Sequence, residues 1–249
     1  SQFNKMNRYA FRRKKIIKNL MFCAFTDFGP DLDNILTAFP SPDVKNSLPK
    51  VLETHKQVYI AETEKYAHVT YFINGGYADH VNGEARIKIV SKNVKNYAEK
   101  PEMSVYEITD TVEKMIKRNL YDFYTINFAN PDMVGHTGDI TATIKAIEHV
   151  DKCIGRLADL IVRKKGVIMI TADHGNAEKM IDPKTKEIWT GHTTNPVPFI
   201  LVSNELKSVK LRCDGVLGDI AATIYQVFGY KKLNKNINKG LIKQYEQKS

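Results

Sequence analysis

The sequence predicts an α/β fold, because short apolar runs alternate along it with longer amphipathic stretches. The chain has 249 residues, of which 43% are hydrophobic and 26% charged, the balance of an ordinary globular protein. This length suits one large domain or two small ones and can bury a substantial core. No apolar run approaches the roughly 20 residues that a membrane-spanning helix needs, so we expect no membrane segment.

Strands are predicted where a short run is rich in aliphatic, aromatic or β-branched residues. In chain order the predicted strands are 21–25, 58–60, 68–73, 86–90, 121–128, 167–170 and 199–202. The run at 167–170 contains no polar residue, so we expect it to form a buried strand.

Three helices are predicted, at 104 to about 118, 140 to about 166, and 219–228. The first begins with Ser104 and Glu107, which form a capping box in which each side chain satisfies a free amide of the first turn. In the second, aliphatic residues recur at spacings of three and four, and Gly166 ends it. Gly229 closes the third.

The positive charge of the chain, +9 at neutral pH, lies at its two ends. Residues 1–20 sum to +7 and residues 231–249 to +5, so the stretch between them carries −3. Such ends can bind nucleic acid or an anionic membrane. We favour solvated terminal segments, because the ends lack the interleaved aromatic residues of a base-stacking surface. We therefore expect neither partner.

The cysteines indicate a reducing compartment. Cys23, Cys153 and Cys213 are odd in number, widely spaced and without a CxxC motif, a pattern that argues against a disulfide framework. The first residues lack the apolar stretch and cleavage site of a secretory signal. We therefore expect a cytoplasmic protein, with Cys153 in the core.

Three polar clusters carry the residue types suited to chemistry. They span 127–138, 171–178 and 191–196. The first two follow predicted strands, and ligands of open α/β sheets collect at the carboxyl ends of strands. A lone Asp or His in a loop is usually a turn former or a solvated side chain. Three clusters that each contain a histidine make coincidence a weaker explanation.

The spacing within these clusters suits metal ions. Asp132 and His136 are four residues apart, so a helical turn or compact loop would direct both at one ion. Asp173 and His174 are adjacent, which suits a bend that divides them between two ions or between an ion and its surroundings. Mixed carboxylate and imidazole ligands favour manganese, zinc or a similar first-row ion. Two such ions about 3.5–4 Å apart would stabilise in-line displacement at phosphorus.

These residues also resemble the motifs of a known family. Asp-Met-Val-Gly-His-Thr-Gly at 132–138, Thr-Ala-Asp-His-Gly-Asn-Ala-Glu at 171–178 and Ala-Glu-Thr-Glu-Lys-Tyr-Ala-His at 61–68 resemble cofactor-independent phosphoglycerate mutases. The Asp-His-Gly motif alone indicates only the wider alkaline-phosphatase-like superfamily, whereas the stretch at 61–68 is far more specific. The similarity runs from about Met21 to Gly229.

The resemblance implies an alkaline-phosphatase-like three-layer sandwich with a mostly parallel central sheet. The chain resembles the C-terminal part of a mutase, with 1–19 as a remnant of the transferase domain or a linker and 20–249 as the phosphatase domain. The family's N-terminal strand and its Asp-Gly motif have no counterpart in this sequence, so we expect a sheet that is incomplete at that strand. A dimer, or a segment supplied from elsewhere, would cover the exposed edge.

The resemblance further implies an isomerase that interconverts 3-phosphoglycerate and 2-phosphoglycerate in glycolysis by two-metal phosphoryl transfer. Such enzymes use two manganese ions and a transiently phosphorylated serine. One ion would be held by Asp132, His136 and His192, and the other partly by Asp173 and His174. The family's Gly-Asn-Ser-Glu-Val-Gly-His segment, which supplies the serine, does not occur in this sequence, and no catalytic nucleophile is identified.

Three residues are expected to bind substrate on the same resemblance. Lys65 matches a lysine that contacts the phosphoryl group near the metals, where a cation balances the transferring charge. Phe-Asn-Lys-Met-Asn-Arg at 3–8 resembles a segment with two substrate-binding arginines. Arg8 keeps one of them, and Lys5 replaces the other with a cation that cannot form a bidentate contact.

Two other functions stay open on the sequence alone. A metal-dependent phosphatase of the same superfamily would use water as its nucleophile and release phosphate. A non-catalytic metal-binding relative would instead use its basic ends to contact nucleic acid or acidic partners, and such binding weakens steeply with salt.

Overall fold

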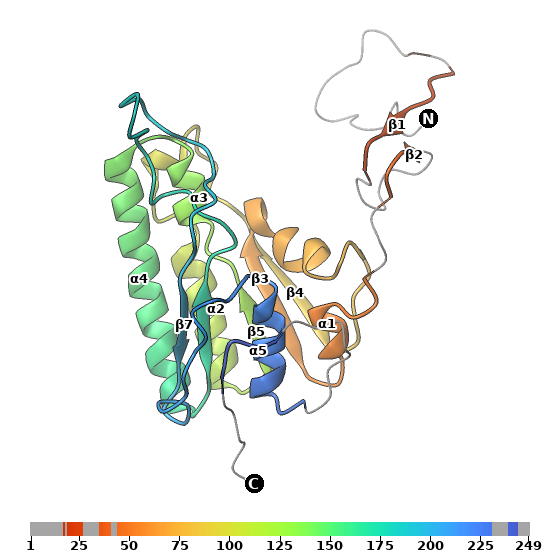
Figure 1. Cartoon of the computed structure of the whole chain (residues 1–249), viewed down its shortest axis with the longest axis vertical. Helices are drawn as coiled ribbons and strands as arrows, with labels where there is room; N and C mark the ends of the chain where they lie inside the picture. The colour runs from red at the N-terminus through yellow and green to blue at the C-terminus, as the bar shows by residue number, and fades with distance from the viewer. Residues whose placement is uncertain (1–16, 18, 27–34, 41–43, 231–238, 244–249) are drawn as a thin grey trace. The chain divides into compact units, whose positions relative to one another are not determined.

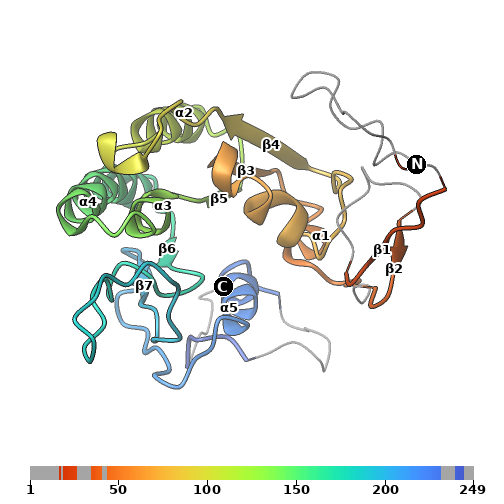
Figure 2. The same cartoon turned by 90° about the horizontal axis from the view of Figure 1, so that it is seen from above.

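A computed structural model of the chain describes residues 17, 19–26, 35–40, 44–230 and 239–243 (Figures 1 and 2). The predicted substrate-binding residues Lys5 and Arg8 lie outside the described residues. The chain divides into two compact units. The first comprises Ser1–Lys88 with Tyr121–Asn127, and the second comprises Ile89–Leu120 with Phe128–Ser249.

The first unit is built on a three-stranded sheet in the order β4–β3–β5. These strands span Gln57–Glu62 (β3), Glu84–Ile89 (β4) and Phe123–Ile126 (β5). β3 and β5 are parallel, with Gln57 opposite Phe123. Every residue of β3 is buried, and Tyr59 and Ala61 pack against Val69 in a small core. The predicted strands at 58–60, 86–90 and 121–128 are confirmed, with shifted ends.

Residues 68–72 are helical, so the strand predicted at 68–73 is wrong. A 3-10 turn at Thr63–Lys65 (η2) leads into a π-helical turn at His68–Phe72 (η3). The Thr70 hydroxyl donates to the Tyr66 carbonyl at 2.7 Å, a local hydrogen bond that a strand could not make. Val69 and Ile73 from this segment pack against Tyr59 and Ala61 of β3, so the tertiary contacts override β propensity.

Several short elements complete the first unit. Cys23–Ala24 (β1) pairs in parallel with Leu36–Thr37 (β2), so the strand predicted at 21–25 is only two residues long. Leu48–Val51 (α1) is a single turn with Pro49 as its second residue, and the sequence patterns did not predict it.

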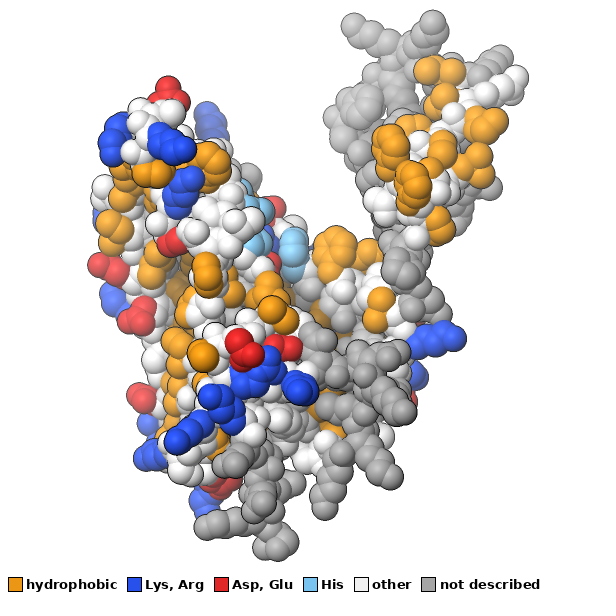
Figure 3. Space-filling view, in the orientation of Figure 1, with side chains coloured by type: hydrophobic (Ala, Val, Ile, Leu, Met, Phe, Trp, Pro, Cys, Tyr) orange, Lys and Arg blue, Asp and Glu red, His pale blue; other side chains and the backbone are white. Residues whose placement is uncertain are grey.

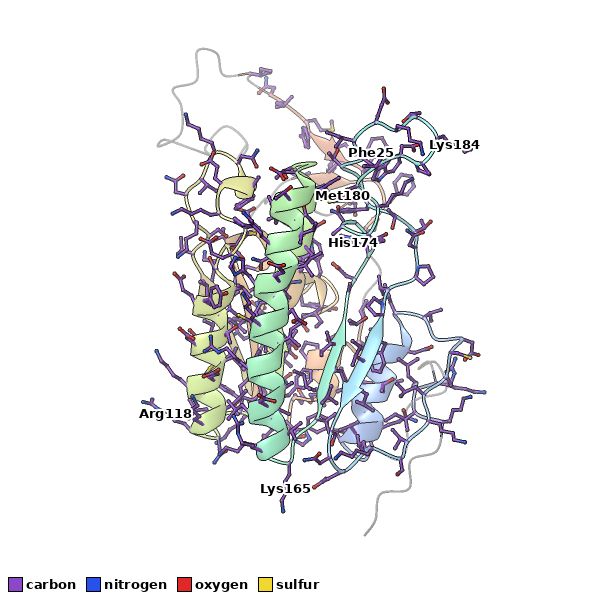
Figure 4. All side chains as sticks on the ribbon, turned by 90° about the vertical axis from the view of Figure 1, so that its left-hand side faces the viewer. Phe25, Arg118, Lys165, His174, Met180 and Lys184 are labelled. Carbon is purple, nitrogen blue, oxygen red and sulfur yellow. The ribbon has the colours of Figure 1, made fainter. Side chains whose placement is uncertain are left out.

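The second unit contains the longer helices and a two-stranded sheet. Its elements are Tyr97–Glu99 (η4), Val105–Lys117 (α2), Asn130–Gly135 (α3), Ile140–Arg163 (α4), Ile168–Thr171 (β6), Phe199–Val202 (β7) and Asp219–Val227 (α5). α2 and α4 lie side by side, and Val105, Val150 and the predicted core residue Cys153 pack between them (Figure 4). All three predicted helices are confirmed. No helix in the described part of the chain is long and apolar enough to cross a membrane.

Two local predictions in the second unit are wrong. Ser104 makes no capping hydrogen bond, because its hydroxyl instead donates to the Val90 carbonyl at 3.4 Å, while Glu107 pairs with Lys92. β6 is half-buried rather than buried, because it pairs with β7 alone among the described strands. The β6–β7 pair is antiparallel, with Ile168 opposite Val202.

Candidate metal centre

The candidate site lies in the second unit, where residues of all three predicted clusters meet. Asp132 and His136 belong to the α3 turn, in which the His136 amide donates to the Asp132 carbonyl at 3.0 Å. The helical turn favoured by their spacing therefore forms. His174 lies beyond the end of β6, as Figure 4 shows, and His192 comes from the loop that precedes β7.

Imidazole nitrogens from three histidines converge on one carboxylate oxygen. Asp132 Oδ1 lies 3.1 Å from the Nε2 atoms of both His136 and His192. The Nε2 atom of His174 lies 3.9 Å from the same oxygen. The His174 and His192 rings stack with their centroids 3.8 Å apart. One ligand atom from each of Asp132, His174 and His192 lies within 4.8 Å of the other two.

The arrangement of hydrogen bonds fits a divalent cation at this point. His136 Nδ1 lies 2.6 Å from the Thr190 carbonyl oxygen, and His174 Nδ1 lies 3.3 Å from that of Gly175. A hydrogen bond donated from Nδ1 leaves the Nε2 lone pair free, which is the tautomer that metal-binding histidines adopt. Lone pairs and a carboxylate that face one another repel, and a cation among them removes that repulsion. The donor set is one that first-row divalent ions accept.

The site is open to solvent on one side. His192 has half of its side chain exposed, at 50%. Figure 3 shows histidine side chains, in pale blue, reaching the surface on this face of the molecule. Asp132, by contrast, keeps only 14% of its side chain exposed. A cation bound here would therefore contact a shielded carboxylate on one side and an incoming ligand on the other.

The other predicted site residues are placed as follows. Asp173 Oδ1 lies 3.7 Å from His174 Nε2, and its side chain is 59% exposed. His174 Nε2 therefore lies near both Asp132 and Asp173. The resemblance had assigned His174 and Asp132 to different ions. Lys65 lies in the first unit on η2, where it is 7% exposed.

The predictions missed two residues that support the histidines and Asp132. The Thr190 carbonyl orients His136, and a backbone group carries no sequence signal for such a role. Asn176 is 5% exposed, and its Nδ2 donates to Asp132 Oδ1 at 2.7 Å. The position of Asn176 in the 171–178 cluster could have indicated this role, because a buried polar side chain beside two candidate ligands needs a hydrogen-bond partner.

Glu178, in the same cluster, is held as a carboxylate. Burial opposes ionisation of the Glu178 carboxyl group. Hydrogen bonds from the side chains of Thr193 and Asn195 and from the backbone amide of Asn176 outweigh that effect and lower the pKa of Glu178. The Asn176 amide donates to Glu178 Oε2 at 2.7 Å, and Asn195 Nδ2 donates to Oε1 at 2.9 Å. Besides Asp132 and Asp173, the site therefore includes a further carboxylate, whose hydrogen bonds go to Asn176, Thr193 and Asn195.

A family model for the Metalloenzyme superfamily matches residues 27–232, which is more than half of the chain. The chain belongs to this superfamily. Membership of this superfamily agrees with a divalent metal ion held by the Asp132, His174 and His192 group.

Two relatives of this chain carry the same name. The chain is 45% identical over 235 residues to the 2,3-bisphosphoglycerate-independent phosphoglycerate mutase of Clostridium novyi (strain NT), covering 94% of this chain and 46% of the relative. It is 47% identical to the protein of that name from Clostridium kluyveri, covering 94% and 45%. The chain spans about half the length of the curated relatives it matches.

A solved structure confirms the predicted fold class. Leishmania mexicana phosphoglycerate mutase, crystallised at low cobalt concentration, matches with a TM-score of 0.81 and 30% identity, covering 88% of this chain and 43% of the mutase. An α/β fold with a parallel strand pair and the predicted resemblance to phosphoglycerate mutases are therefore both confirmed.

Proposed function

We propose that this chain forms the metal-binding part of a phosphoglycerate mutase, an isomerase that interconverts 3-phosphoglycerate and 2-phosphoglycerate in glycolysis. The observation that carries the proposal is the convergence of three imidazole nitrogens on Asp132 Oδ1. The names of the relatives at 45–47% identity support the same activity. The cytoplasmic location expected from the cysteine pattern belongs to this proposal, and Cys23, Cys153 and Cys213 are free thiols.

We assign two manganese ions to the site. Asp132, His136 and His192 hold one of them, and Asp173 and His174 contribute to the other. Bound divalent ions neutralise the oxygens of a transferring phosphoryl group. Hydrogen bonds keep these side chains in place for this role. The carbonyls of Thr190 and Gly175 orient His136 and His174, and the Asn176 side chain holds Asp132.

We also assign the substrate contacts that the motifs imply. Lys65 supplies a point cation for the phosphoryl group, since it is a buried lysine within the mutase-specific 61–68 stretch. Arg8 and Lys5 supply charge to the phosphoglycerate. An N-terminal segment supplied from elsewhere, or a second copy of the chain, completes the protein.

Manganese binding is the first test. Electron paramagnetic resonance of free Mn²⁺ should show saturable binding to the whole chain, and Asp132→Asn should remove the ion assigned to Asp132, His136 and His192 because its carboxylate charge is gone. Glu187→Gln, which removes an exposed carboxylate from the hairpin at 181–188 closed by the Ile181–Ile188 bridge, should leave binding unchanged. A chain that fails to bind Mn²⁺ would contradict the proposed function.

An assay of turnover then separates the mutase from its alternatives. The chain is incubated with 3-phosphoglycerate, with and without Mn²⁺, and both 2-phosphoglycerate and free phosphate are measured, beside an Asp173→Ala variant. Manganese-dependent 2-phosphoglycerate that disappears in Asp173→Ala supports the mutase. Phosphate release without isomerisation would instead favour the metal-dependent phosphatase.

A further inference from the structure

The two loops that carry His174 and His192 are joined just beyond these histidines. Gly175 and Thr193 form an isolated antiparallel bridge, in which the Thr193 amide donates to the Gly175 carbonyl at 2.9 Å. A single bridge is a weak connection between two loops, because one backbone hydrogen bond contributes only about 0.5–1.5 kcal/mol. A further contact is needed to keep the two imidazoles stacked.

Glu178 supplies that contact with both of its oxygens. Its Oε1 accepts hydrogen bonds from Thr193 Oγ1 and, at 2.9 Å, from Asn195 Nδ2, so it holds the loop that carries His192. Its Oε2 accepts from the Asn176 amide at 2.7 Å, which holds the loop that carries His174. One carboxylate therefore ties the two loops together.

The same connection reaches the Asp132 carboxylate. The backbone amide of Asn176 donates to Glu178, and its side-chain Nδ2 donates to Asp132 Oδ1 at 2.7 Å. The same Nδ2 atom lies 3.5 Å from His136 Nε2. Asn176 is buried, so its side chain has little freedom to find another partner. A displacement of Glu178 would therefore move Asn176 and, through it, change the positions of Asp132 and His136.

We propose that Glu178 is a positioning residue that clasps the 174–178 and 191–195 loops and so sets the affinity of the site for a divalent ion. The proposal rests on the proposed metal-binding function and extends it to a residue that does not face the ion. Ionised carboxylates make the stronger hydrogen bonds, and only a carboxylate accepts at both ends. A glutamine would direct an N–H group at one of these donors.

The chain at Gly175 is consistent with such a clasp. A Cβ atom added there would collide with Thr193 Oγ1 and with Glu178 Oε1. Only a residue without a side chain lets the loop pass beneath the hydrogen bond between them.

Metal affinity in matched variants tests the proposal. Removing a group that hydrogen-bonds a metal ligand directly typically costs 10–100-fold in affinity, and Glu178 acts one contact further out, so Glu178→Gln should weaken Mn²⁺ binding by roughly 10-fold, the lower end of that range. Glu187→Gln makes the same change at an exposed carboxylate of the nearby hairpin and should bind Mn²⁺ like the unsubstituted chain. The resonance spectrum of bound Mn²⁺ should broaden in Glu178→Gln alone, because the ligands are less well fixed.

Thr193→Val provides a milder variant that preserves side-chain shape while removing one donor to Glu178. Because both substitutions break the same hydrogen bond, their effects on Mn²⁺ affinity should not add in the double variant. Additive effects, or a Glu178→Gln affinity within twofold of the unsubstituted chain, would overturn the clasp. Circular dichroism of each variant without metal checks that the fold is kept.

Hydrogen exchange without metal separates this inference from the proposed function. Glu178→Gln should speed amide exchange in both the 174–178 and 191–195 segments, and Glu187→Gln in neither. Faster exchange in only one segment, or in none, would overturn the clasp even if the chain binds Mn²⁺. Failure of the unsubstituted chain to bind Mn²⁺ would overturn the proposed function, and the exchange result would still decide whether the clasp exists.

Discussion

Asp132 Oδ1 lies 3.1 Å from the Nε2 atoms of two imidazoles and accepts a hydrogen bond from the Asn176 side chain at 2.7 Å. Asn176 in turn fills the space above the α3 backbone at Gly135. The carboxylate is therefore positioned by a packed amide rather than by solvent. A small increase in side-chain volume at residue 135 should therefore displace Asn176 and change the position of the Asp132 carboxylate.

Gly135→Ala should disturb this packing. A Cβ atom at residue 135 would lie 2.6 Å from Asn176 Oδ1, so the amide must move away from Asp132. Overpacking of this kind destabilises by about 1–3 kcal/mol. Urea denaturation and Mn²⁺ titration should show lower stability together with weaker binding.

Gly155→Ala serves as the matched control for that substitution. Gly155 lies inside α4, and a Cβ atom there would meet nothing within 4 Å. Alanine in a helix interior should raise the free energy of unfolding by about 0.5–1 kcal/mol relative to glycine. Equal effects of the two substitutions would show that packing against Asn176 is unimportant.

Among the elements, α2 and α4 are joined by an ion-pair network as well as by their core. Arg156 on α4 donates to Glu113 at 2.9 Å and to Asp110 at 2.6 Å, both on α2. Burial works against ionisation of Glu113, but hydrogen bonds from Lys117 and Arg156 outweigh it and lower the Glu113 pKa from its ordinary value of 4.5. The network therefore makes helix packing sensitive to acid.

Glu113→Gln should reveal that sensitivity. A carboxyl group whose pKa is lower in the folded state stabilises the fold above its unfolded pKa, and this stabilisation is lost as the pH falls through the folded value. At pH 7 the variant should lose on the order of 1 kcal/mol, because the pair is partly screened by solvent. Urea denaturation from pH 7 downward should show the gap between variant and unsubstituted chain closing below about pH 4.5. A gap that persists in strong acid would contradict the assignment.

The β6–β7 pair forms a sheet of only two strands in the described part of the chain, and two-stranded sheets are marginal by themselves. Its outer edges present unpaired backbone groups, and Ile200 on β7 is 48% exposed. We therefore expect self-association that grows with concentration. Sedimentation velocity across a hundredfold range of concentration should show it, and a monomer that melts in one cooperative transition at every concentration would contradict it.

For the molecule as a whole, metal binding and folding should be coupled. An ion that binds only the folded state stabilises it by about 2.7 kcal/mol when present at 100 times its Kd. Differential scanning calorimetry should show a transition that rises with Mn²⁺ and returns on chelation. The residues assigned to the metal ions all lie in the second unit, so a transition confined to the first unit should not move. In Asp132→Asn the effect of Mn²⁺ should be smaller, because one of the two assigned ions is lost.

The helices and most strands followed from the sequence because their signals are local. The three-and-four spacing of aliphatic residues specified α4, and an unbroken apolar run specified β3 and β7. Local signals failed where a distant partner competed. Ser104 bonds to Val90 instead of capping α2, and residues 68–73 coil so that Val69 packs on β3.

The sequence by itself determined the α/β class, the mutase resemblance and the residue types able to hold a metal ion. Only the tertiary structure decided how those residues meet. Asp132 and His192 are 60 positions apart, and no spacing rule states that they lie 3.1 Å from one another. The supporting contacts from Thr190, Asn176 and Glu178 are likewise long-range, because each joins loops that come together only when the chain packs.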